Sequence, residues 1–172
     1  MSAVRWSVPF EELAVGQSFT TRPRIVTEAD LVAFSALTGD WHPQHSDAEW
    51  AASSRFGERI AHGMLIVSFA VGLVPFDPER VVALRRIGEV VFKRPVAIGE
   101  SIRVDGKLAS LSELDAELGL VRWAWSLCNE RDALVARAHV DVLWRRRAAQ
   151  PPDAAEPAEG NAHEYAAGVF PC

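Results

Sequence analysis

After Thr27, apolar residues recur at the spacing of a helix, so that Leu31, Phe34 and Leu37 fall on one face. Thr27 begins a sequence of capping-box type, in which a hydroxyl side chain precedes acidic residues in the first turn. Gly39 follows the last apolar residue and favours the left-handed backbone that ends many helices. The pattern therefore predicts an amphipathic helix between Thr27 and Gly39.

Two further helices are predicted before position 75. A second capping sequence begins at Ser46 and predicts a short helix to Ser53 or Ser54, with Trp50 as its apolar anchor. From Gly63 the chain is apolar on every face until Pro75, and its length favours a helix over a strand. A helix without a polar face must be buried on all sides.

Beyond the apolar run the period of the pattern changes to two. Apolar and polar residues alternate through 102–108, 121–127 and 134–144, and a shorter apolar segment covers 89–92. Residues 17–27 indicate a strand more weakly. We expect long antiparallel strands with one covered face, hence an α+β domain in which one buried helix packs against a curved sheet.

The composition divides the chain at residue 147. Residues 1–147 predict one folded domain, whereas residues 148–172 form an Ala/Pro-rich stretch with little apolar periodicity. That stretch carries four acidic residues and no Lys or Arg, so it holds most of the formal net charge of −5. We expect it to be a disordered acidic tail.

Charge and hydropathy exclude two classes of partner. A net charge of −5 provides no basic field to hold nucleic acid. The longest apolar run, from Met64 to Val74, is about half the length that a bilayer requires. The first residues lack an apolar secretion segment, and Cys128 and Cys172 form neither a metal spacing nor a disulfide framework. We therefore expect a cytoplasmic protein without membrane contact.

Most of the residues suited to chemistry lie in two places: the loop between the first two predicted helices, and the entry to the apolar run that begins at Gly63. Asp40, His42 and His45 share one loop, and His62 directly precedes Gly63. Asp40 beside a glycine is also an ordinary turn residue. Carboxylates and imidazoles, with Asp47 included, are also donors that zinc accepts. Residue types alone leave these alternatives open.

Combined with later segments, the loop resembles the MaoC-like dehydratases, which include the (R)-specific enoyl-CoA hydratases. The resemblance covers about residues 10–145. It is carried by Thr38-Gly39-Asp40-x-x-Pro43-x-His45-x-Asp47, by Phe56 and Ile60-Ala61-His62-Gly63-Met64-Leu65-x-x-Ser68, and by Val91-Phe92-x-x-Pro95-Val96-x-x-Gly99-Glu100. The family implies a single hot dog domain, in which an antiparallel sheet wraps a long helix.

The resemblance also implies roles for individual residues. Asp40 and His45 would be the catalytic pair, and which of them takes the proton of water stays open because the two may titrate together. The backbone N–H of Gly63 would stabilise the enolate oxygen, since the first N–H groups of a helix are unpaired. The supporting candidates are His42, where many members carry Asn, His62, which would hold the helix entry, and Ser68.

The expected activity is that of a hydro-lyase. It would hydrate trans-2-enoyl thioesters, or dehydrate (R)-3-hydroxyacyl thioesters, carried on coenzyme A or acyl carrier protein, without a cofactor or metal. Lys93 and Arg94 are candidate contacts for the carrier phosphates, which they would reach from the neighbouring subunit. An acyl thioesterase on the same fold and a non-catalytic acyl-thioester-binding subunit are the alternatives. The family also implies a homodimer, for which strands 121–128 and 134–144 would offer the sheet edge.

Overall fold

The protein is described here by a computed structural model, which covers residues 2–147. Residues 148–172, with the predicted acidic tail and Cys172, lie outside the described residues. Within residues 2–147 no helix is long and apolar enough to cross a bilayer.

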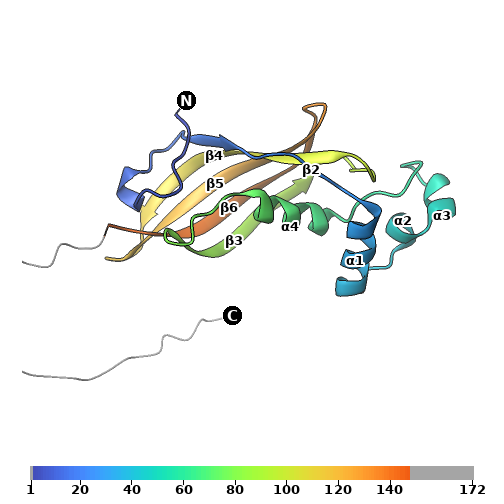
Figure 1. Cartoon of the computed structure of the whole chain (residues 1–172), viewed down its shortest axis with the longest axis horizontal. Helices are drawn as coiled ribbons and strands as arrows, with labels where there is room; N and C mark the ends of the chain where they lie inside the picture. Colours follow the sequence, from blue (N-terminus) through green and yellow to red (C-terminus); the bar gives the residue numbers. More distant parts are fainter. Residues whose placement is uncertain (1, 148–172) are drawn as a thin grey trace, which may run out of the picture.

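One antiparallel sheet forms the body of the domain (Figure 1). Its strands run in the order β1-β4-β5-β6-β3, and β2 pairs with β4 beside β1. The four long strands are 12 or 13 residues each, and three of them, β4, β5 and β6, contain the alternation read from the sequence. Their bounds, with those of the two short strands, are β1 Ser18–Thr20, β2 Arg24–Ile25, β3 Val81–Phe92, β4 Ser101–Glu113, β5 Leu118–Asn129 and β6 Leu134–Arg145.

The open edge of the sheet is not formed by the strands predicted from the sequence. Strands β5 and β6 were expected to offer the edge, yet both are interior: β5 lies between β4 and β6, and β6 lies between β5 and β3. One edge is formed by the short strands β1 and β2, and the long edge strand is β3, of which the sequence revealed only the end at 89–92. An edge strand has one partner and much exposed surface, so its residues need not alternate, and the segment from Val81 to Gly88 carries no period-two signal.

Helix α4 (Gly63–Leu73) lies across the inner face of the sheet (Figure 1). Leu65, Ile66 and Ala70 face the sheet and join the main hydrophobic core. The helix is not buried on every side as predicted, because Met64 is 57% exposed and Ser68 is also exposed. The exposed stripe is the side of α4 that the sheet does not cover.

The core is closed at one end by tryptophans. The rings of Trp123 and Trp144, on the neighbouring strands β5 and β6, are fully buried. Trp6 packs against both, at ring centroid distances of 5.5 Å and 5.9 Å. The Nε1–H of Trp144 donates a 2.9 Å hydrogen bond to the carbonyl of Val8. These contacts hold the N-terminal segment, with its 3₁₀ turn η1 (Phe10–Glu12), against the sheet.

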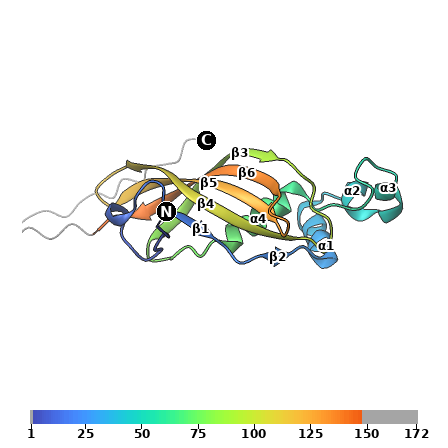
Figure 2. The same ribbon diagram turned by 90° about the horizontal axis from the view of Figure 1, so that it is seen from above.

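Helices α1 (Glu28–Thr38), α2 (Pro43–Ser46) and α3 (Ala48–Ala52) gather beyond the N-terminal end of α4, as Figure 2 shows from above. The capping box of α1 is confirmed, because Thr27 accepts from the N–H of Asp30 while the carboxylate of Asp30 accepts from the N–H of Thr27. Gly39 ends α1 in the left-handed region, as predicted.

Two apolar side chains of these helices are more exposed than the pattern indicated. Leu37 is 83% exposed and Trp50 is 45% exposed, so neither anchors its helix to the core of this chain. The short helix α3 begins after Asp47, whose carboxylate accepts from the N–H of Trp50. Asp47 thus has the capping role that the sequence gave to Ser46.

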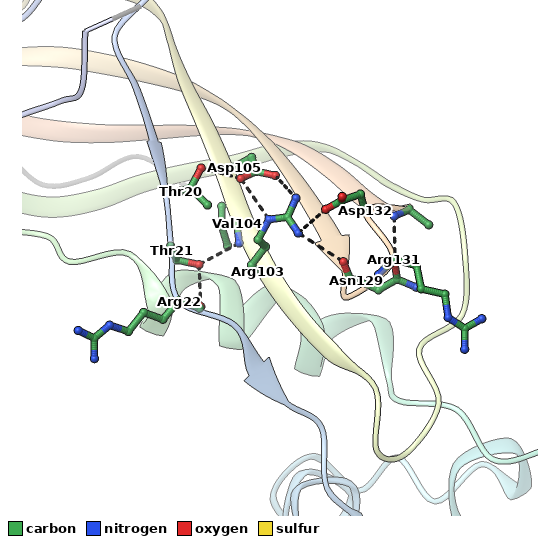
Figure 3. Close-up of polar contacts among 10 residues, drawn as sticks. Thr20, Thr21, Arg22, Arg103, Val104, Asp105, Asn129, Arg131 and Asp132 are labelled. Carbon is green, nitrogen blue, oxygen red and sulfur yellow. Dashed lines mark hydrogen bonds and ion pairs between the residues drawn. The ribbon is translucent and has the colours of Figure 1, made fainter.

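A charged cluster ties β4 to the turn that joins β5 and β6 (Figure 3). Arg103 contacts the carboxylates of Asp105 and Asp132 at 3.1 Å and 2.8 Å, and it reaches the carbonyl of Asn129. On the other side of β4, the N–H of Val104 donates to the hydroxyl of Thr21. These contacts fix β4 to the segments beside it at the end of the sheet near α1.

Candidate active site

A cavity of about 480 Å³ opens at the start of α4. The loop after α1, the first turn of α4 and the segment that follows β3 all contribute to its wall. Its lining combines a carboxylate, two imidazoles and three cations with a larger apolar surface. The lining residues are Phe34, Asp40, His45, Arg55, Phe56, Ile60, Ala61, His62, Gly63, Met64, Ile66, Phe92, Lys93, Arg94, Pro95, Val96 and Val135.

Asp40 is placed by a tight turn after α1. Its carboxylate oxygen Oδ1 accepts from the N–H of His42 at 3.3 Å, and its own N–H donates to the hydroxyl of Thr38 at 3.3 Å. The turn role considered from the sequence is therefore real. It uses one carboxylate oxygen only, and Asp40 still lines the cavity.

His45 lies in the single turn of α2, which Pro43 begins and His42 caps. Its Nδ1–H donates to the carbonyl of Ile60 at 2.7 Å. Because a carbonyl only accepts, this bond places the proton of the neutral ring on Nδ1 and leaves the lone pair on Nε2. Burial lowers the pKa of His45 below its ordinary value, since the partly enclosed site disfavours the imidazolium. His45 is thus suited to accept a proton at Nε2.

His62 connects three parts of the site. Its ring is buried and stacks on His45 with the centroids 3.8 Å apart. Its Nε2–H donates to the backbone carbonyl of Asp40 at 3.0 Å and lies 3.2 Å from the hydroxyl of Ser35 on α1. His62 therefore joins α1, the Asp40 turn and the start of α4. This geometry agrees with the structural role expected from the sequence.

Gly63 and Met64, in the first turn of α4, line the cavity, and no side chain of the described residues caps this helix start. His62 is the N-cap residue, yet its side chain makes no capping bond. The first intrahelical bond joins the N–H of Ile66 to the carbonyl of His62, so the earlier amides have no intrahelical partner. Within residues 2–147 the N–H of Gly63 has no acceptor, and it carries the positive end of the helix dipole.

Gly63 also lies in close contact with the ring of Phe92. A Cβ atom built on Gly63 would lie 2.6 Å from Cζ of Phe92, which is too close for any other residue type without displacement of that ring. This contact concerns the missing side chain of Gly63, whereas the role implied by the resemblance concerns its backbone N–H.

Two of the supporting candidates do not line the cavity. His42 caps α2 by accepting from the N–H of Gln44 at its Nδ1, at 3.1 Å. Ser68 lies one turn further along α4 and donates to the carbonyl of Met64. Lys93 and Arg94, by contrast, lie in the wall of the same chain's cavity.

The structure changes the set of residues that a metal alternative would use. The donor atoms that lie within 4.8 Å of one another belong to Asp40, His45 and His62. His42 and Asp47, which residue types alone also offered as donors, cap helices instead. The Nε2 of His62 is already bonded to the carbonyl of Asp40, which weakens it as a ligand.

Arg55 and Phe92 were given no role by sequence reasoning. Arg55 follows α3 and Phe92 ends β3, and both line the cavity. Arg55 stands in an unremarkable polar stretch, so the sequence alone provides no signal for it. Phe92 was visible only as one apolar residue of a motif, because its contact with Gly63 joins segments 29 positions apart.

The sequence of the folded region is similar to that of known proteins. The family model described as MaoC like domain matches residues 10–118. Protein MaoC of Klebsiella aerogenes is 42% identical over 96 residues, which are 55% of this chain and 29% of that protein. The (R)-specific enoyl-CoA hydratase of Aeromonas caviae is 31% identical over 103 residues, which are 60% of this chain and 76% of the enzyme. The chain thus spans less than a third of the Klebsiella protein.

Solved structures share the architecture. A protein from Archaeoglobus described as a monoamine oxidase regulatory protein superposes with a TM-score of 0.78 at 34% identity, covering 84% of this chain and 99% of that one. Rv0216 of Mycobacterium tuberculosis, described as a double hotdog fold, superposes with a TM-score of 0.75 at 20% identity, covering 91% of this chain and 54% of that one. The predicted α+β hot dog fold is confirmed, and the chain belongs to the MaoC-like domain family.

Proposed function

We propose that the protein is a hydro-lyase that adds water to trans-2-enoyl thioesters, or removes it from (R)-3-hydroxyacyl thioesters. The observation that carries this proposal is the gathering of Asp40, His45 and the unpaired N–H of Gly63 around one cavity. Hydration requires a base for water, a proton for the carbon next to the thioester, and a donor for the enolate oxygen. The cavity contains groups of all three kinds.

His45 is the better base of the proposed pair. Its Nδ1–H is held by the carbonyl of Ile60, so the lone pair of Nε2 is available to a water molecule beside Asp40. As the water oxygen bonds to C3 of the substrate, His45 takes one water proton and the double-bond electrons move to the thioester oxygen. The pair then returns a proton to C2, which completes the 3-hydroxyacyl product.

The thioester oxygen would accept from the N–H of Gly63. The negative charge that develops on this oxygen is stabilised by the positive end of α4. An uncapped helix start beside a base is consistent with this role, since the amide is not already bonded to a side chain.

Three cations favour a substrate with an anionic carrier. Arg55, Lys93 and Arg94 line the cavity, and within residues 2–147 none of them forms an ion pair with a carboxylate. The phosphates of coenzyme A or of a carrier protein's prosthetic group are suitable anions. Because these side chains belong to the same chain as Asp40 and His45, the proposed contact does not depend on a neighbouring subunit.

A hydration assay tests the proposed activity. Purified protein is mixed with short, long and branched trans-2-enoyl-CoA thioesters, and loss of the conjugated enoyl absorbance is followed while free thiol is measured in parallel. We expect enoyl loss without thiol release, and slower reaction with pantetheine thioesters that lack the phosphates. Thiol release would indicate a thioesterase, and an unchanged spectrum with every substrate would contradict the hydratase assignment.

The pH dependence of kcat/KM should report the state of His45. Its pKa lies below the ordinary histidine value because of burial, and only the neutral ring can accept a proton. We therefore expect full activity near neutrality and an acid limb with its midpoint below about 6.5. Rates from pH 5 to 9 provide the measurement.

His139→Gln is the control, because it alters an imidazole that is paired with Glu89 outside the cavity. This variant should keep the acid limb. A midpoint above neutrality in the parent protein would contradict the assignment.

We also propose that the protein is a homodimer that pairs through β3. Among the described strands β3 has one neighbour only, and Val82 and Leu84 on it are exposed. Open apolar edges are prone to pair with another chain. Phe92 ends this strand and lines the cavity, so a second copy along β3 would lie next to the proposed site.

Sedimentation equilibrium at low micromolar concentration should give twice the chain mass. Leu84→Arg places a charge on the pairing edge and should shift the protein towards monomer with loss of activity. Leu114→Arg is the matched control, because Leu114 is equally exposed but lies in the turn after β4. A fully active monomeric parent would contradict the dimer.

A further inference from the structure

Phe92 places an aromatic ring directly over the first residue of α4. The three atoms nearest to the Cβ position of Gly63 all belong to this ring, at 2.6 Å and 2.9 Å. The side chain is nevertheless 48% exposed, so it is not a core residue. A large apolar ring that is half exposed and lines a cavity forms a wall that a ligand would touch.

The backbone around Phe92 is shaped to hold that position. The pairing of β3 with β6 shifts register between Gly88 and Val91, and Glu89 within this bulge has a positive φ of 53°. Bulges of this kind re-aim the side chains that follow them. Directly after Phe92, the N–H groups of Lys93 and Arg94 both donate to the carbonyl of Val135. The backbone is therefore fixed both before and after Phe92.

We infer that Phe92 determines specificity at C2 of the acyl group, and that it excludes thioesters with an alkyl branch at C2. The inference rests on the proposed function, in which the thioester oxygen accepts from the N–H of Gly63. C2 is separated from this oxygen by one carbon, a distance of about 2.4 Å. An oxygen about 2.9 Å from the amide nitrogen therefore keeps C2 within about 5.3 Å of that nitrogen, in the part of the cavity wall to which Gly63 and Phe92 both contribute.

The missing Cβ of Gly63 shows how little room is left. A methyl-sized group at that position would meet the ring at 2.6 Å. A methyl group on C2 that points towards Phe92 meets the same ring, whereas a hydrogen there does not. The substrate class that fits is therefore an enoyl thioester whose C2 carries hydrogen only, with chain extension beyond C3.

The test compares crotonyl-CoA with tiglyl-CoA, its 2-methyl derivative. The parent should strongly prefer crotonyl-CoA. Phe92→Ala should raise the tiglyl-to-crotonyl ratio of kcat/KM by about tenfold or more, the discrimination that one methyl-sized contact provides. Phe92→Leu should give an intermediate ratio. Phe56→Ala is the matched control, because Phe56 lines the same cavity and is 40% exposed but is not among the atoms nearest to Gly63.

A binding measurement separates this inference from the proposed reaction. Titration calorimetry with butyryl-CoA and 2-methylbutyryl-CoA gives the same comparison without turnover, on variants whose thermal unfolding shows that they are folded. Selective binding that is lost in Phe92→Ala supports the inference even if no enoyl thioester is hydrated, an outcome that contradicts the proposed function alone. An equal preference for both ligands in the parent, or an unchanged ratio in folded Phe92→Ala and Phe92→Leu, overturns it.

Discussion

Asp40→Asn and His45→Gln should each lower kcat for hydration by about 10²–10⁴-fold, which is the usual contribution of a positioned acid or base. Asn keeps the size of Asp40 and an oxygen that can accept from the N–H of His42, so the turn should survive. Gln at position 45 remains polar but cannot take up a proton near neutrality. Both variants should therefore fold and bind substrate while turnover is lost. Stopped-flow measurement of enoyl absorbance gives kcat and KM separately.

The double variant and a neighbouring histidine provide the controls. If Asp40 and His45 act as one unit, the double variant should be little worse than either single one. His42→Asn should keep most of the activity, because His42 caps α2 and Asn is a good N-cap residue. Turnover that persists in both Asp40→Asn and His45→Gln would contradict the site and the enzyme assignment together.

Trp123→Ala should lower the free energy of unfolding by about 3–5 kcal/mol, the usual cost of truncating a buried aromatic side chain. The ring of Trp123 is fully buried and packs against Trp6 and Phe19, at centroid distances of 5.5 Å and 5.2 Å. A cavity there would also loosen the N-terminal segment. Urea unfolding followed by circular dichroism gives the value.

The two buried tryptophans respond differently to replacement by Phe. Trp123 has an Nε1–H without an acceptor among the described residues, so Trp123→Phe removes an unsatisfied donor along with part of the packing. Trp144→Phe instead leaves the carbonyl of Val8 without its donor, which adds about 1–3 kcal/mol. Trp144→Phe should therefore be the more destabilising change. The opposite order would show that ring volume, not hydrogen bonding, dominates at these positions.

Local sequence signals were sufficient for most of the helical and inner-strand structure. Thr27, Asp30 and Gly39 specify the two ends of α1 through bonds that reach no further than four residues. Strands β5 and β6 were visible because both are interior and each buries one face, which leaves a period of two. The period-two signal is lost in most of β3, because this edge strand lacks a neighbouring strand on one side.

The candidate site could be predicted where its residues are close in sequence. Asp40 and His45 lie in one loop, and the resemblance to a family identified them. The bond between His62 and the carbonyl of Asp40 spans 22 positions, and the contact of Phe92 with Gly63 spans 29. Such contacts depend on how the loop, α4 and the edge strand pack, which no local pattern encodes.

The cavity is built by two kinds of segment with different tolerance to change. The groups proposed to carry the reaction sit on helix ends and turns, where backbone hydrogen bonds and the buried ring of His62 hold them. The wall that would contact the acyl chain includes Phe92, a half-exposed residue at the end of an edge strand. Because Phe92 is half exposed, a substitution there removes less packing within the chain than one at a buried residue such as His62. Among descendants of this chain, substrate preference should therefore diverge well before the chemistry does.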